Sequence, residues 1–190
     1  MPIIIVTPPT FEPVSLSEAK LNLRVDGTDE DSLIQRLIST ARRYCEREGR
    51  MTIPATTLRL TMDVMPCGFK VLRIPNPPLI SVTSIVYIDT AGVSQTMSAS
   101  LYKVAPGGAE EGRIAPAFGL VWPVNRMEIG AVQITYVAGY STAAEIPVTT
   151  AQAMHLLIGQ WYAKREPEGS ASDDIASAVG SLLWCERVKI

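Results

Sequence analysis

Histidine and cysteine, the side chains that most often bind metals or form covalent crosslinks, are scarce in this sequence. His155 is the only histidine, so a histidine-based metal site would need several acidic or cysteine partners, and no local spacing supplies them. The three cysteines, Cys45, Cys67 and Cys185, are odd in number and far apart, which fits neither a disulfide framework nor a CxxC metal pair. We therefore expect no metal, no cofactor, and reduced, partly buried thiols.

A strong excess of one charge is also lacking. The chain has 17 basic and 19 acidic residues and a net charge of −2, so no overall basic field draws it to nucleic acid or anionic lipid, and any DNA contact must be local. No stretch of about 18 apolar residues exists, and the apolar start "MPIIIVTPP" lacks the basic region of a signal peptide. These absences predict a soluble, cytosolic protein that does not bind a membrane.

What the sequence does contain is typical of a folded protein. Of its 190 residues 47% are hydrophobic and only 19% are charged, which favours a packed core over disorder. This length suits one domain, or a helical domain with an inserted sheet.

Two helices are predicted near the N-terminus. Ser15 and Glu18 have the spacing of a capping box, with Val14 and Ala19 placed as a hydrophobic staple, so a short helix should span about 15–23. A longer helix should run from about 29 to 48, where Gly49 is well placed to end it. Its apolar residues recur at helical spacing: Leu33, Ile34, Leu37, Ile38, Ala41, Tyr44 and Cys45.

Acidic residues cluster in "VDGTDEDSLIQRL" (25–37), just before the longer helix. A calcium loop is one interpretation, but the glycine follows the first Asp directly and no bidentate Glu closes the loop. A helix start explains the cluster better. Thr28 or Asp29 can cap the first amides, while Glu30 and Asp31 complement the positive end of the helix dipole.

The middle of the chain, about 56–138, changes to short alternating runs broken by Gly and Pro. The strand candidates are "TLRLTMDV", "KVLRI", "SVTSIVYI", "LYKV" and "AVQITYVA". "DTAG" (89–92) should form a hairpin loop with Gly92 at the positive-φ position, and "GGAEEG" (107–112) a turn between strands. We expect an antiparallel sheet of five or six strands.

Helical spacing returns after Pro147, which suits a helix's first turn. One helix should run to about Lys164, followed by an exposed loop over 165–172 and a last helix capped by Ser172. The predicted order is therefore helix, helix, sheet, helix, helix.

A small serine hydrolase is a weak alternative. "GYSTA" (139–143) resembles a damaged G-x-S-x-G elbow, and Ser141 with His155 could form part of a triad. The elbow needs a parallel sheet and an immediate helix, whereas Pro147 delays the helix and the sheet is predicted to be antiparallel. We expect the segment to be a simple loop and the protein not to be an enzyme.

Two surface features suggest binding instead. Arg36, Arg43, Arg47 and Arg50 are spaced by 7, 4 and 3 residues and form one stripe opposite the apolar face of the long helix. The stripe is either a solvated face, a subunit contact or a face towards DNA. Trp184 lies off the apolar stripe of the last helix, so it either docks on a partner or folds back onto its own domain.

Three segments resemble one known family. They are "PVSLSEAKLNLRVDGTDEDSLIQRLISTARRYCE" near the start, "GRIAPAFGLVWP" (112–123) and "VAGYSTAAEIPVTTAQAMHLLIGQWYAKRE" (137–166). In this order and at these lengths they are similar to the head-tail connector (adaptor) proteins of long-tailed bacteriophages and of phage-derived gene transfer agents. The likeness spans nearly the whole chain and is weakest in the C-terminal tail.

The resemblance implies an α+β fold, with a helical bundle core of about four helices and an antiparallel sheet inserted between the second and third. Residues 1–55 and 146–190 would form the core, and 56–140 the insertion, within a single connector domain.

The resemblance also implies a structural role in the virion neck, with host cytoplasm as the place of assembly. Such proteins form a ring, commonly dodecameric, beneath the portal; they extend the DNA channel and offer a surface to the next neck protein or tail terminator. Trp184, Val188 and Ile190 would then contact the portal, and the arginine stripe would meet a neighbouring subunit or passing double-stranded DNA. A tail-side completion protein is the alternative within this class.

Overall fold

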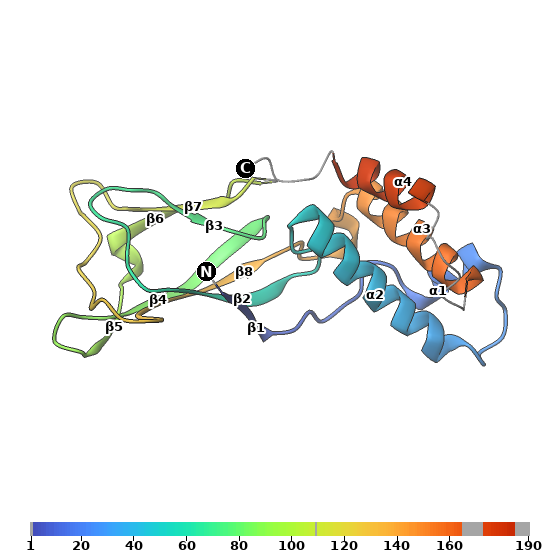
Figure 1. Cartoon of the computed structure of the whole chain (residues 1–190), viewed down its shortest axis with the longest axis horizontal. Helices are drawn as coiled ribbons and strands as arrows, with labels where there is room; N and C mark the ends of the chain where they lie inside the picture. Colours follow the sequence, from blue (N-terminus) through green and yellow to red (C-terminus); the bar gives the residue numbers. More distant parts are fainter. Residues whose placement is uncertain (1, 109, 165–172, 185–190) are drawn as a thin grey trace. The chain divides into compact units, whose positions relative to one another are not determined.

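The computed structural model describes residues 2–108, 110–164 and 173–184. The chain divides into two compact units of similar length, each of which combines two stretches of sequence (Figure 1). We call Met1–Pro9 with Ala55–Gly139 the β unit, and Thr10–Pro54 with Tyr140–Ile190 the helical unit. The mixed α+β class expected from the sequence is confirmed.

The β unit contains two antiparallel sheets. The larger has the order β1 (Ile3–Thr7), β2 (Thr56–Met62), β8 (Val132–Ala138), β4 (Leu79–Ile88) and β5 (Ser94–Thr96). The smaller has the order β3 (Leu72–Ile74), β7 (Gly112–Pro116) and β6 (Tyr102–Ala105), with a short 3-10 helix, η1 (Ala99–Leu101), before β6. The alternation in the sequence specifies these strands, because every second residue of β2 and β8 is buried.

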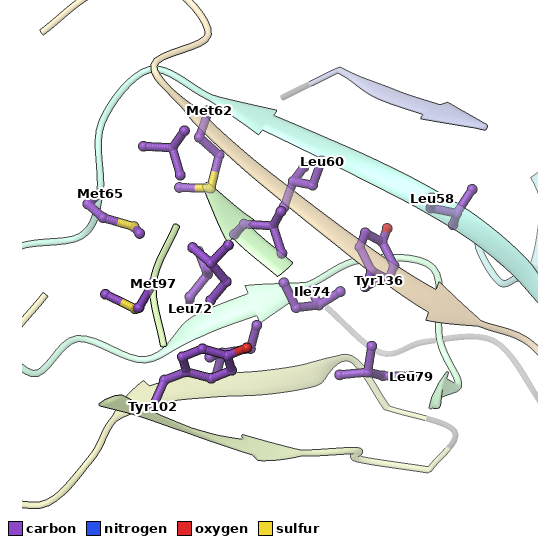
Figure 2. Packing of buried hydrophobic residues seen from close by; sticks show 14 of the residues in the cluster. Leu58, Leu60, Met62, Met65, Leu72, Ile74, Leu79, Met97, Tyr102 and Tyr136 are labelled. Atoms are coloured by element: carbon purple, nitrogen blue, oxygen red, sulfur yellow. The ribbon is translucent and has the colours of Figure 1, made fainter. Parts of the chain in front are cut away.

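One hydrophobic cluster joins the two sheets of this unit. Leu60 and Met62 of β2 and Leu72 and Ile74 of β3 belong to it and are all nearly or fully buried (Figure 2). Tyr136 of β8 is fully buried in the same cluster, and its hydroxyl donates to the carbonyl of Pro75 at 3.2 Å. The buried tyrosine therefore has its polar end satisfied, as close packing requires.

The N-terminal strand was not expected. The described residues contain eight strands rather than five or six, and β1 precedes the first helix. The prediction that the sheet lies wholly between the second and third helices is therefore not confirmed. Physically, β1 completes the sheet by pairing with β2 over Ile3↔Leu60 to Thr7↔Thr57. A short apolar run between prolines carries no alternation to reveal it, because Ile4, Ile5 and Val6 are exposed in succession.

Both turns predicted within the β unit are confirmed. Asp89 Oδ1 accepts hydrogen bonds from the amides of Ala91 and Val93, both at 2.9 Å, and Gly92 has φ 86° in the hairpin between β4 and β5. Gly107 and Gly108 also have positive φ in the turn between β6 and β7.

The helical unit contains α1 (Leu16–Leu23), α2 (Asp31–Gly49), α3 (Val148–Ala163) and α4 (Asp173–Trp184), with a 3-10 turn, η2 (Ala143–Glu145), before α3. The predicted apolar stripe of α2 packs on α3 and α4 in a second hydrophobic cluster. Its buried members include Ile34, Ile38, Ala41, Cys45, Ala153, Met154, Leu157, Ile158, Val179 and Leu183. At the edge of this cluster Tyr44 and Trp161 meet edge to face, with ring centroids 6.1 Å apart.

One predicted helix cap agrees with the structure, and two differ from it. The capping box of α1 is confirmed, because Ser15 Oγ accepts from the amide of Glu18 at 3.2 Å while the Ser15 amide donates to Glu18 Oε2 at 2.8 Å. Neither Thr28 nor Asp29 caps α2, whose N-cap is Glu30. Gly49 is the last helical residue, and it is Arg50 that takes the left-handed conformation, with φ 52°. Gly49 is buried beside Met51, and an added Cβ would lie 2.5 Å from Met51 Cε, the end of a flexible side chain that would have to shift.

None of the helices in the described residues combines the length and apolarity that a bilayer crossing needs.

Candidate assembly surfaces

A charged network that the sequence analysis missed lies on α2 of the helical unit. Arg42 is only 8% exposed; its Nε donates to Glu12 Oε2 at 2.8 Å and its Nη1 to Glu46 Oε2 at 3.0 Å. Glu46 Oε1 accepts a further hydrogen bond from the amide of Ile53 at 3.2 Å. Burial raises the pKa of Glu46 above its usual range, and the nearby Arg42 guanidinium opposes this rise.

The network gathers three separate segments of the chain. The carbonyl of Ile53 also accepts from the amide of Tyr140 at 2.8 Å. Glu12, Ile53 and Tyr140 each lie within three residues of a point where the chain passes from one unit to the other. We call Glu12, Arg42, Glu46, Ile53 and Tyr140 the junction network. Helical spacing offered a signal for it, because Arg42 follows the buried Ile38 by four residues and precedes the buried Cys45 by three.

The predicted arginine stripe lies on the solvent side of α2. Arg36, Arg43 and Arg47 are all exposed on the helix, and the exposed Arg50 follows at its C-cap. Arg47 Nε lies 3.7 Å from Glu48 Oε1, and both side chains are well exposed, so this ion pair contributes little. The stripe therefore presents guanidinium groups that are open to a partner.

The predicted C-terminal contact is described only in part. Trp184 is the last residue of α4, but its side chain is not among those described, and Val188 and Ile190 lie outside the described residues. Just before them, Val179 and Leu183 are buried in the core of the helical unit.

The acidic cluster of the sequence begins α2, as predicted. Asp31 lies in the first turn of the helix and its Oδ1 accepts a hydrogen bond from Lys20 Nζ at 2.6 Å, while Glu30 accepts one from the Tyr162 hydroxyl. Among the described residues no group of three His, Cys, Asp or Glu side chains could hold a metal ion. These carboxylates therefore join α1, α2 and α3 of one unit.

The other candidate groups are also placed. Ser141 is exposed and its amide donates to Glu145 Oε2 at 3.0 Å, whereas Nδ1 of His155 is buried without a hydrogen-bond partner. Burial raises the pKa of the Cys45 thiol to about 12, so it stays protonated, and Cys67 is exposed. Cys185 lies outside the described residues.

Exposed apolar side chains mark a further surface that the sequence analysis missed. Sixteen of the eighteen large hydrophobic side chains exposed in the described part of the chain belong to the β unit. Nine of them lie in the two loops 63–71 and 117–130, which we call the apolar platform. The available signal was "AFGLVWPVNRMEIG", an apolar run with neither strand nor helix periodicity.

The sequence and the fold were compared with known proteins. Residues 13–71 match the family model of the phage gp6-like head-tail connector protein. A comparison with curated proteins found no match.

Among solved structures, a chain in the neck of an empty gene transfer agent (GTA) particle, computed with C6 symmetry, matches with TM-score 0.82 and 23% identity. A chain in the virion of the native GTA particle matches with TM-score 0.81, and one in the native neck computed with C12 symmetry with TM-score 0.79, both at 23% identity. Each match covers 100% of this chain and 97% of the other.

The matched family and the matched chains are structural components of virus-like particles, not enzymes, which agrees with the prediction for this protein. The resemblance of the sequence to phage and gene-transfer-agent head-tail connectors is thus confirmed, by a family match over residues 13–71 and by a fold shared over the whole chain.

Proposed function

We propose that this protein is a structural component of the neck of a phage or gene transfer agent, where it forms a ring beneath the portal and carries the next neck or tail protein. The observation that supports this most strongly is the match of the whole fold to a chain of a GTA particle neck, at TM-score 0.82 and with 97% of that chain covered. The family match over residues 13–71 supports it independently, because it rests on sequence alone.

The matched necks were computed with C6 and C12 symmetry, which supports a closed ring of identical copies. Twelve copies is the expected number. The ring forms while the particle assembles in the host cytoplasm, and the free chain is expected to be a monomer that assembles on the portal.

The arginine stripe is the proposed contact for DNA or for a neighbouring subunit. A net charge of −2 suits a channel lining, since DNA must slide past it without being gripped and without sequence readout. Arg36, Arg43 and Arg47 supply local positive charge on an exposed helix face.

A charge-neutralised variant tests the stripe. Arg36→Gln/Arg43→Gln/Arg47→Gln removes three charges, and Arg73→Gln/Lys103→Gln/Arg113→Gln removes three exposed charges from the β unit as a matched control. If the stripe faces DNA, a plot of the logarithm of the DNA-binding constant against the logarithm of salt concentration becomes less steep. Its slope decreases in magnitude by about 0.9 for each phosphate that the variant no longer neutralises. If both DNA binding and ring assembly are unchanged, the stripe contacts neither DNA nor a neighbouring subunit and is only a solvated face.

The C-terminal segment is the proposed portal contact, through Trp184, Val188 and Ile190. Tryptophan and aliphatic side chains at a chain end suit a docking peptide that fills pockets on a partner. Deletion of residues 184–190 should therefore abolish portal binding while the rest of the protein remains folded.

The main experiment is light scattering on a sizing column, for the protein alone and then with portal assemblies from the same genome. Co-elution at ring-like mass, abolished by deletion of 184–190, supports the connector role and the proposed docking segment. No association at any salt concentration contradicts it and favours a tail-side completion protein, whose partner a pull-down from assembling particles would identify.

A further inference from the structure

The apolar platform is unusually exposed for a surface of a folded protein. Phe118 and Ile129 are 106% and 96% exposed, and Met127 and Val124 are 85% and 78% exposed. The full set is Val64, Phe69, Val71, Phe118, Leu120, Val121, Val124, Met127 and Ile129. Exposed apolar patches of this density mark interaction sites on soluble proteins.

The platform is held in one conformation by buried polar anchors. The indole of Trp122, only 4% exposed, donates to the carbonyl of Lys70 at 2.7 Å. Asn125, 5% exposed, accepts from the amide of Met65 at 2.8 Å and donates to the carbonyl of Asp63 at 3.0 Å. The two loops are thus fixed side by side, so the apolar side chains project from a preorganised support and binding would cost little ordering entropy.

The platform is close to neutral. Its only charged residues are Asp63, Lys70, Arg126 and Glu128, two of each sign. Arg126 Nε lies 3.2 Å from Glu128 Oε2, and Asp63 Oδ1 accepts from the amide of Gly130 at 2.8 Å. A strongly charged partner therefore finds no complement here, whereas an apolar protein surface does.

A second, different apolar surface lies on the same unit. Strand β1 is at the edge of the five-stranded sheet and exposes Ile4, Ile5 and Val6, and residues 2–11 contain no charged side chain. Edge strands usually carry charges or are short and polar, as β5 (Ser94–Thr96) is at the opposite edge. β1 carries no charge; its ends are flanked by Pro2 and Pro8, and its pairing with β2 has a bulge between Ile5 and Thr7, but Ile4, Ile5 and Val6 remain exposed.

We propose that the apolar platform of one copy binds the exposed β1 surface of the next copy, so that these two surfaces form the head-to-tail contact of the ring. This inference rests on the proposed function, because a closed ring requires each copy to present two unlike, mutually complementary surfaces. The β unit carries two unlike surfaces that are both apolar and exposed.

Chemistry favours a second copy as the occupant. Contacts between identical subunits are more apolar than contacts between transient partners, and both surfaces are apolar and nearly uncharged. Phe118 alone offers on the order of 150 Å², and with nine exposed apolar side chains the platform is larger than the β1 surface, which has three.

Charge substitutions on exposed side chains test the contact. Met127→Asp alters the platform, Ile5→Lys alters β1, and Leu21→Asp, at an 82% exposed position of the helical unit, is the matched control. Self-association is measured by sedimentation velocity up to high protein concentration, and by the mass of complexes formed on portal assemblies. Circular dichroism melts verify that each variant folds.

We expect Met127→Asp and Ile5→Lys each to weaken self-association at least tenfold, and Leu21→Asp to leave it unchanged. The double variant Ile5→Lys/Met127→Asp should regain association, since Lys of one copy then meets Asp of the next. Such rescue is not expected from two surfaces that never touch.

Several results would overturn the inference. Wild-type-like association of Met127→Asp would do so, as would weakening by Met127→Asp but not by Ile5→Lys. A wild-type protein that does not self-associate, either alone or when portal assemblies are present, also contradicts the inference. The same holds if the Met127→Asp variant forms a normal ring but fails to bind the next neck protein, because the platform would then contact that protein. Failure of the proposed function is distinct, because the wild type then ignores the portal while the weak self-association that appears only at high protein concentration retains this pattern of variant effects.

Discussion

The two units of this protein are alike inside and different outside. Each contains about half of the chain, and among the described residues their hydrophobic clusters have sixteen and fifteen buried members. Yet the β unit exposes sixteen large hydrophobic side chains and the helical unit exposes two in its described part, Leu21 and Val148. Since the cores are equally well filled, the difference concerns binding rather than folding.

Charge is distributed the other way. The best-formed ion pairs, those of Lys20 with Asp31 and of Arg42 with Glu12 and Glu46, are in the helical unit. The helical unit thus uses charge to fix its own helices and connecting segments, whereas the two platform loops of the β unit carry only four charged residues, two of each sign. In the contact proposed above, the helical unit is the stable frame and the β unit supplies the apolar surfaces.

The largest effects on stability are expected from substitutions in the two hydrophobic cores. If the two interiors are equivalent, the same kind of substitution should have a similar effect in each. Ile134→Ala in the β unit and Ile38→Ala in the helical unit each truncate a side chain that is at most 2% exposed. We expect each to lower the free energy of unfolding by about 2–5 kcal/mol. Urea denaturation followed by circular dichroism measures this decrease.

The exposed counterparts serve as controls. Phe118→Ala and Leu21→Ala should change stability by no more than about 0.5 kcal/mol. A large destabilisation by Phe118→Ala would show that the platform is part of the fold of the β unit, and would break the distinction between core and binding surface.

Next in size is removal of the centre of the junction network. Arg42→Ala leaves Glu46 without its cation in a buried position and releases Glu12. We expect a destabilisation of roughly 2–3 kcal/mol, below the range for fully buried pairs because the side chain of Glu12 is 36% exposed. Arg47→Ala on the same helix, at an 83% exposed side chain, is the control and should be nearly neutral. Equal midpoints of urea unfolding for the two variants would contradict the structural role of the network.

A smaller effect is expected at the capping box of the helical unit. Ser15→Ala should cost about 1 kcal/mol, because the amide of Glu18 loses its acceptor. The hydrogen bond from the Ser15 hydroxyl, and then that from the Ser15 amide, lower the pKa of Glu18 below its usual 4.5.

The pKa of Glu18 also fixes the sign of a pH effect. Since the folded pKa is depressed, the contribution of Glu18 is present above the unfolded pKa of 4.5 and is lost as the pH falls through the lower folded value. Thermal melts from pH 7 to pH 3 should therefore show the deficit of Glu18→Gln shrinking with acidification. A deficit that grows would exclude this account.

The smallest effect is expected where α2 ends. Arg50 has φ 52°, a conformation that is unfavourable for side chains with a Cβ, so Arg50→Gly should raise stability by a few tenths to about 1 kcal/mol. Arg24→Gly, at φ 57° after α1, tests the same idea in the same unit. Destabilisation by both variants, seen as lower melting temperatures, would mean that the arginine side chains make contacts that outweigh backbone strain.

Much of the helical unit was predictable because its signals are local. The capping box of Ser15 and Glu18 and the stripe of Ile34, Ile38 and Cys45 lie within a few residues of one another in sequence. The hairpin at Asp89 and Gly92 is local in the same way. By contrast, Arg42 was missed because its partner Glu12 lies 30 residues away.

The sequence by itself therefore determined the helices, most strands, the exposed arginine stripe and the family resemblance, since these depend on periodicity, caps and order along the chain. Only the tertiary structure decided that Ile3–Thr7 completes a sheet and that Arg42 is buried between two carboxylates. It also decided which apolar residues face water: Trp122 is buried and Phe118 is exposed within the same short loop. Burial depends on neighbours distant in sequence, so hydrophobicity alone could not distinguish the core from the surface proposed for assembly.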